Sequence, residues 1–222
     1  MEQPDPPPYD GLQDYDKNDI VQPIILTLIG RLIRSESISS PVLYYELDHD
    51  VNFLSRDDHK VVFSRNEQRV RTDRHGTVRT NSHLKHIFNL ESPHAITSTS
   101  SYEYFITSVS RRTMGNAGLK KTFVPRPGFK VMQINRSGGD KELFEITRKN
   151  GIYEWWDDEG KRIAIDEREN GQLKMIITTA MPRPKVDVRT PTTIKLSTLA
   201  ASRPMSPMSL VDAHPMRCPN TT

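Results

Sequence analysis

Two Asn-Gly dipeptides, Asn150-Gly151 and Asn170-Gly171, constrain the fold of this chain more than any other feature. Asn-Gly is a preferred sequence for two-residue β-hairpin turns, because both positions of a type I′ turn need a positive φ. Each dipeptide lies between short runs rich in branched and aromatic residues, in the order KVMQINR, LFEITRK, IYEWWDD, RIAIDERE and LKMIITTA. Residues 130–180 are therefore predicted to form an antiparallel meander.

The two turns also predict the strand register. Two-residue loops at these positions pair compatible side chains across the strands: Ile146 with Trp155, Arg148 with Tyr153, Ile165 with Ile176, and Glu167 with Lys174. Strand alternation then places Tyr153 and Trp155 on one face, and Asp157–Gly160 form the next turn. An acid–base catalyst needs carboxylates in two different environments, whereas these three acids share one exposed turn. The acidic stretch is therefore interpreted as a hairpin turn.

Strand signals extend over most of the remaining chain. The runs IILTLIGRLI, VLYYEL, KVVFSR, HIFNL and YEYFITSV alternate with Ser, Asp, Asn and Pro, and no long helical period is present. The predicted fold class is all-β and mainly antiparallel. Residues 20–201 form the predicted barrel domain, residues 1–19 a disordered acidic, proline-rich arm, and residues 202–222 a disordered tail.

Composition narrows the class of protein. Cys218 is the only cysteine, so a secreted domain built on disulfides is excluded. The N-terminus carries acids and prolines, unlike a signal peptide, and the apolar window 20–33 is too short for a membrane span. We expect a cytoplasmic, monomeric protein that is at most peripheral at membranes. The net charge of +3 does not by itself predict nucleic-acid binding.

Three stretches together resemble fungal members of the tubby C-terminal-like superfamily: SSPVLYYELDHDV (39–51), YEYFITSVSRRTMGN (102–116) and the IYEWWDDEGKRIAIDE hairpin. That superfamily includes the LURP-one-related proteins and the phospholipid scramblases. The resemblance covers residues 24–180 and rests on the order and character of the strands. It implies a closed barrel of about twelve antiparallel strands around a central, apolar C-terminal helix.

The C-terminal segment departs from that pattern. Residues 185–201 read KVDVRTPTTIKLSTLAA, which is rich in threonine and charge and is interrupted by Pro191. Either the central helix is short and poorly apolar, or this chain ends differently from its relatives. The sequence leaves open whether the segment is helix, strand or disordered.

A basic stretch is the first candidate site. Residues 111–130 contain six cations and no acid: Arg111, Arg112, Lys120, Lys121, Arg126 and Lys130. Such a loop can collect anionic lipid headgroups or phosphate oxygens, with about 1 kcal/mol per cation near a charged bilayer. The resemblance strengthens this prediction, since tubby proteins bind phosphoinositides. The alternative is a solvated surface loop without a ligand.

A PPxY sequence is the second candidate site. Pro6, Pro7 and Tyr9 belong to the stretch DPPPYDG, and proline-rich segments of this kind dock into the aromatic groove of WW domains. Nedd4-type ubiquitin ligases are recruited through such motifs, so one is a candidate partner. The alternative is a chance match in a disordered arm.

No sequence pattern indicates an enzyme or a cofactor. His83 and His86 form an HxxH pair, which is interpreted as a loop histidine and a strand histidine and not as metal ligands. We expect a non-enzymatic binding module for an anionic lipid, a phosphoinositide or a protein partner. The alternatives are a scramblase-like or other lipid-handling protein and, more weakly, nucleic-acid binding through residues 111–130 and the arginine-rich 65–79.

Overall fold

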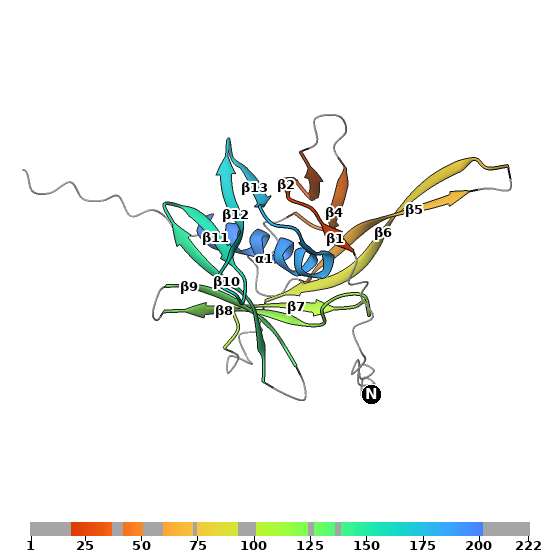
Figure 1. The fold of residues 1–222 in the computed structure, drawn as a ribbon. Coiled ribbons are helices and arrows are strands. Elements are labelled where there is room, and N and C mark those ends of the chain that lie inside the picture. Colours follow the sequence, from red (N-terminus) through yellow and green to blue (C-terminus); the bar gives the residue numbers. More distant parts are fainter. Residues whose placement is uncertain are drawn as a thin grey trace, which may run out of the picture.

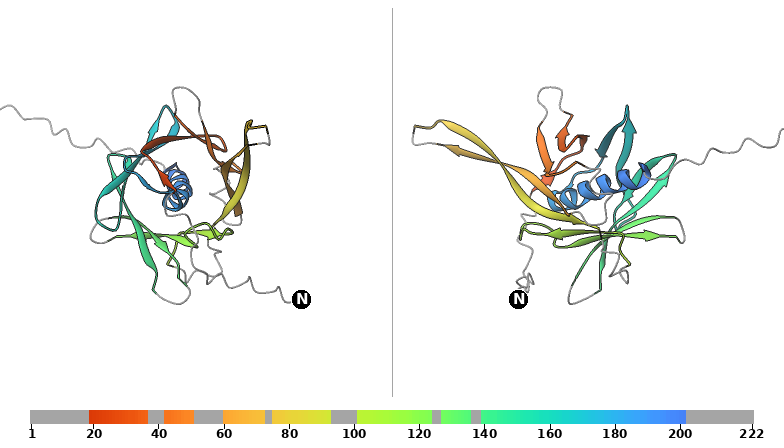
Figure 2. Two further views of the ribbon diagram at one scale, coloured as in Figure 1. Left: turned by 45° about the vertical axis from the view of Figure 1, so that its right-hand side comes forward. Right: turned by 180° about the vertical axis from the view of Figure 1, so that it is seen from behind.

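The computed structural model describes residues 19–36, 42–50, 60–72, 75–92, 101–123, 127–135 and 139–201. Twelve antiparallel strands close into one barrel, and a single helix runs through its interior (Figures 1 and 2). The barrel strands are β2 (Ile24–Ile29), β3 (Leu32–Ser35), β4 (Leu43–Leu47), β5 (Lys60–Thr72), β6 (Val78–Glu91), β7 (Tyr104–Ser108), β8 (Ala117–Thr122), β9 (Gly128–Gln133), β10 (Lys141–Lys149), β11 (Ile152–Trp156), β12 (Arg162–Glu169) and β13 (Gln172–Ile177).

The barrel is a continuous meander. Each strand pairs with its neighbours in the sequence, and pairing of β13 with β2 closes the ring. A short β1 (Ile20–Val21) pairs with β14 (Met181–Pro182), and helix α1 (Arg183–Ala201) follows directly. The prediction of an antiparallel all-β barrel is confirmed, and the C-terminal segment that the sequence left open is a helix.

Both Asn-Gly turns have the predicted geometry. Asn150 and Gly151 have φ values of 52° and 84°, and Asn170 and Gly171 have values of 51° and 81°. The four predicted residue pairs all occur in the observed register, so the register inferred from the turns is confirmed. The turns fix the strand register because each two-residue loop directly joins two residues that pair across the hairpin.

The acidic stretch after the tryptophans is a hairpin turn, as predicted. The Asp157 carboxylate accepts hydrogen bonds from the backbone amides of Glu159 (3.1 Å) and Lys161 (2.8 Å), and Gly160 has a φ of 74°. Trp155 points inward, is fully buried, and packs edge-on against Phe144 with 5.8 Å between ring centroids.

The central helix is polar, which corrects the apolar helix that the resemblance implied. Within residues 183–198 of α1, whose burial the structure describes, the buried aliphatic residues are Val186, Val188, Ile194 and Leu196. Its buried polar residues are more numerous: Asp187, Arg189, Thr190, Thr192, Thr193, Lys195 and Ser197. The hydroxyls of Thr190 and Thr192 donate to backbone carbonyls one turn earlier, around Pro191. Partners on the barrel wall, described below, offset the cost of burying the charges.

Candidate anion-binding site

Strands β5 and β6 extend well beyond the barrel as a two-stranded ribbon (Figures 1 and 2). Strand β4 pairs with β5 only along 63–65, and β7 pairs with β6 only along 88–91. Within the part of the chain that the structure describes, the strand segments 66–72 and 78–84 therefore pair only with each other. We call residues 66–86 the arm.

The register divides the arm into two faces. Pairing and strand alternation assign one set of positions to the face that continues the barrel interior: 65, 67, 69 and 71 on β5, with 85, 83, 81 and 79 on β6. Five of these eight positions are arginine or lysine, and Glu67 is the one acid. The opposite face has no charged residue, and its Val78 and Leu84 are exposed. We call the first set the charged face.

Basic residues accumulate towards the tip of the arm. Residues 68–85 contain five arginines and lysines against a single acid, Asp73, in a chain whose whole net charge is +3. Arg71 lies directly opposite Arg79 in the register. Like charges at directly opposed positions destabilise a strand pair. This placement concentrates positive charge on the part of the ribbon that projects from the barrel.

The base of the arm is electrostatically balanced. The Glu67 carboxylate lies 2.6 Å from a guanidinium nitrogen of Arg65, 3.5 Å from the Lys85 ammonium and 3.7 Å from Nε2 of His83. Burial raises the pKa of Glu67, but Arg65 and Lys85 outweigh it, so the pKa lies below its ordinary value. Glu67 is therefore an ionised counterion for the base of the arm.

Arg65 connects the arm to the buried helix. Its second guanidinium nitrogen donates to Asp187 at 2.6 Å, and the Tyr45 hydroxyl donates to the other oxygen of Asp187 at 2.8 Å. Burial raises the pKa of Asp187 to about 6 despite these partners. Arg183, which begins α1, binds Asp19 through its Nε at 2.7 and 2.8 Å. Arg183 also interacts electrostatically with Asp187. Asp19, the start of α1 and the base of the arm therefore belong to one charged network.

A second charged cluster fixes the middle of the helix. Arg189 donates to Asp166 of β12, whose carboxylate also accepts from the Trp155 indole (2.5 Å) and the Thr193 hydroxyl (2.7 Å). Both partners of the ion pair are buried, and burial raises the pKa of Asp166 and lowers that of Arg189. Nε and Nη1 of Arg189 lack a hydrogen-bond partner, and the guanidinium lies 4.9 Å from the centre of the Trp155 ring.

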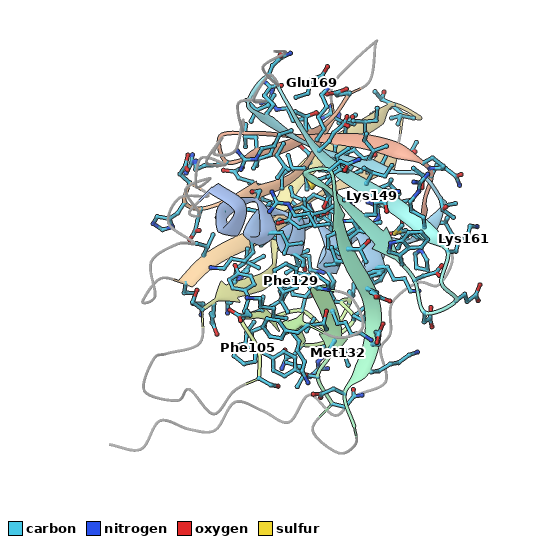
Figure 3. The ribbon with its side chains drawn as sticks, turned by 90° about the vertical axis from the view of Figure 1, so that its left-hand side faces the viewer. Phe105, Phe129, Met132, Lys149, Lys161 and Glu169 are labelled. Carbon is cyan, nitrogen blue, oxygen red and sulfur yellow. The ribbon has the colours of Figure 1, made fainter. Side chains whose placement is uncertain are left out.

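A cavity of about 460 Å³ opens between the β10–β11 and β12–β13 hairpins and the later part of α1. Figure 3 shows this region from the side, with Lys149 and Glu169 labelled at the ends of β10 and β12. Its lining includes Arg148 and Arg168, but also the carboxylates of Asp166 and Glu167. Arg168 already donates to the Ser197 carbonyl at 2.9 Å. The lining balances its charges and favours no single class of ligand.

The structure divides the basic stretch that the sequence marked. Arg111 and Arg112 lie in the connection before β8, Lys120 and Lys121 lie on β8, and Lys130 lies on β9, while Arg126 lies outside the described residues. The prediction of one continuous loop is therefore wrong, because two strands run through it. Lys130 forms a 2.6 Å ion pair with Glu142, and that hydrogen bond raises the pKa of the lysine.

The other predicted residues have separate positions. Pro6, Pro7 and Tyr9 lie outside the described residues. His83 and His86 are both on β6, so the placement of His83 in a loop is wrong, and Nε2 of His86 lies 2.9 Å from Oδ1 of Asn89. Among the described residues, no group of three or more His, Cys, Asp and Glu side chains could hold a metal ion.

Comparisons with known proteins name no family for this chain: no family model, no curated protein and no solved structure matched it. The resemblance to tubby-like proteins therefore stays a prediction. In the described part of the chain, α1 included, no helix has the length and apolar character needed to cross a membrane.

Proposed function

We propose that this protein is a non-enzymatic binding module that holds an anionic ligand on the charged face of the arm. The observation that carries the proposal is Arg71 placed opposite Arg79 on a ribbon that projects from the barrel. Five basic residues against one acid in 68–85 give this element a stronger positive charge than the whole chain. A projecting element with a net positive charge attracts anions and speeds their association.

The buried acids support a binding role over a catalytic one. Asp166 and Asp187 are the fully buried carboxylates of the described chain, and each pairs with an arginine and accepts at least one further hydrogen bond. Both are thereby committed to holding α1 inside the barrel. The structure consequently provides a rigid support on which the arm is displayed.

Vesicle flotation tests the proposal with lipid as the anion. The purified chain is mixed with vesicles of phosphatidylcholine alone or with phosphatidylserine, at about 50 and about 200 mM salt, and the same variants are run on immobilised heparin. We expect binding to at least one of these polyanions at low salt. The double variant Arg71→Gln/Arg79→Gln should weaken it by about thirtyfold, at roughly 1 kcal/mol for each lost cation.

A matched variant distinguishes the arm from general positive charge. Arg111→Gln/Arg112→Gln removes the same charge from the exposed connection before β8. Retained binding by this variant supports the arm as the site. Equal loss in both variants would show that net charge is responsible, and loss in the Arg111/Arg112 variant alone would move the site to the stretch first predicted. Absence of binding to every polyanion refutes the proposal.

A further inference from the structure

We infer that the anionic ligand of the arm is duplex DNA, with the two-stranded arm seated in the major groove. This inference rests on the proposed function and names its ligand. It follows from the shape of the arm, the kinds of side chain it carries and the ligands that its composition disfavours.

The shape of the arm matches the groove. Seven residue pairs, from Asn66↔Leu84 to Thr72↔Val78, form the ribbon beyond the barrel. At about 3.3 Å per residue this is a rod roughly 23 Å long, with strands about 4.8 Å apart. The major groove of B-form DNA is about 12 Å wide and admits a two-stranded β-ribbon, so the arm fits without opening the duplex.

The side chains of the arm are of the kinds that contact DNA. Arginine binds phosphates and the major-groove edge of guanine, and asparagine and glutamine bind adenine. Residues 66–86 supply arginine, asparagine, glutamine, serine and threonine, with Asp73 and Glu67 as the two acids. Glu67 is already held by Arg65 and Lys85 at the base, away from the tip. Beyond Glu67, the described positions 69, 71, 79 and 81 of the charged face carry three arginines and one asparagine, and none of these four carries a carboxylate that would repel phosphates.

Composition disfavours the competing ligands. No phenylalanine, tyrosine or tryptophan occurs in 64–86, so the arm lacks the stacking platform of these rings on which single-stranded nucleic acid binds. Among the described residues 75–78 near the tip, Val78 is the one apolar side chain, and no large apolar or aromatic residue is present there to insert between lipids. A second copy of the chain would bring two arms of the same charge together. Duplex RNA has a major groove too narrow for side chains to read.

Fluorescence anisotropy with the full chain and a labelled duplex of about 20 base pairs, roughly two helical turns, tests the inference. Affinity is measured across a salt series for the unchanged chain, for Arg71→Gln/Arg79→Gln, and for Arg111→Gln/Arg112→Gln. We expect the arm variant to bind roughly tenfold more weakly or worse at low salt. Its plot of log affinity against log salt should be shallower by about 1.8, since each phosphate contact contributes about 0.9. The matched variant should keep the affinity and slope of the unchanged chain.

A duplex RNA of the same sequence and anionic vesicles complete the test. Binding to DNA at least about tenfold tighter than to the RNA supports insertion in the major groove. Equal or tighter binding to RNA overturns it, as does an unchanged salt slope in the arm variant. Arm-dependent binding to vesicles or heparin without binding to DNA overturns this inference and leaves the proposed function standing. Thermal melting of each variant separates lost binding from lost folding.

Discussion

Asp187→Asn tests whether burial or ion pairing governs the charged network at the start of the helix. Asp187 is fully buried and accepts hydrogen bonds from Tyr45 on β4 and Arg65 on β5, with Arg183 as a further nearby cation on α1. An exposed ion pair of this geometry would lower the pKa of the carboxyl. Burial instead raises the pKa of Asp187 from 3.8 to about 6. Arg65 offsets the cost of burial only in part, because it also donates a hydrogen bond to Glu67.

The raised pKa fixes the sign of the pH dependence. Between about pH 4 and 6 the folded chain holds a proton on Asp187 that the unfolded chain has lost. The stability from this group is therefore fully present below pH 3.8 and is lost as pH rises through about 6. A shift of about two pKa units corresponds to roughly 3 kcal/mol, at about 1.4 kcal/mol for each unit.

The asparagine variant cannot lose this proton, so the comparison isolates the effect. Urea unfolding is followed by tryptophan fluorescence, because Trp155 is buried in the core, at several values between about pH 4 and 8. We expect the free energy of unfolding of the wild type, minus that of Asp187→Asn, to fall by about 3 kcal/mol across this range. A constant difference, or one that rises with pH, would refute the reasoning, because a depressed pKa gives the opposite slope.

Three further predictions concern the turns, the core and the N-terminal segment. Gly151→Val and Gly171→Val should each lower stability by roughly 1–3 kcal/mol through the strain of a positive φ, measured by thermal melting; unchanged melting in both would contradict the assigned turns. Trp155→Ala should cost roughly 3–5 kcal/mol in urea unfolding, and a loss below about 1 kcal/mol would argue against full burial. A synthetic peptide of residues 1–16 should bind a WW domain in the micromolar range or more weakly, and Tyr9→Ala should abolish this in fluorescence polarisation; equal binding by both peptides would leave the motif without a role.

The hairpins could be predicted because their information is local. Asn150-Gly151 specifies the turn, and the alternation of residues on either side then specifies which pairs meet. The same reasoning placed Tyr153 and Trp155 on one face of the sheet and the three acids after Trp156 in a turn. Each of these conclusions needs only the residues of one hairpin.

The helix could not be predicted because its information is distant. Asp187 and Arg189 make residues 185–201 look like an exposed segment until their partners are known. Asp187 meets Tyr45 and Arg65, which are 142 and 122 residues away, and Arg189 meets Asp166 only after the barrel has closed. Removing one partner of such a pair leaves a buried charge, which costs more than the pair contributes. The pairs therefore also specify the rotation and depth of the helix in the barrel.

The arm could not be predicted from the sequence for a different reason, which bears on its function. Its residues alternate as strands do, but the arginine-rich stretch 65–79 offers no apolar face that would mark it as part of a sheet. An isolated two-stranded hairpin is marginally stable in water. The ribbon is held at its base by the barrel and by the contacts of Glu67 with Arg65 and Lys85. Conflicts between local sequence and stability concentrate at functional sites. The net positive charge of the projecting ribbon therefore removes the apolar strand signal from its sequence, and the same charge is the reason to propose an anionic ligand there.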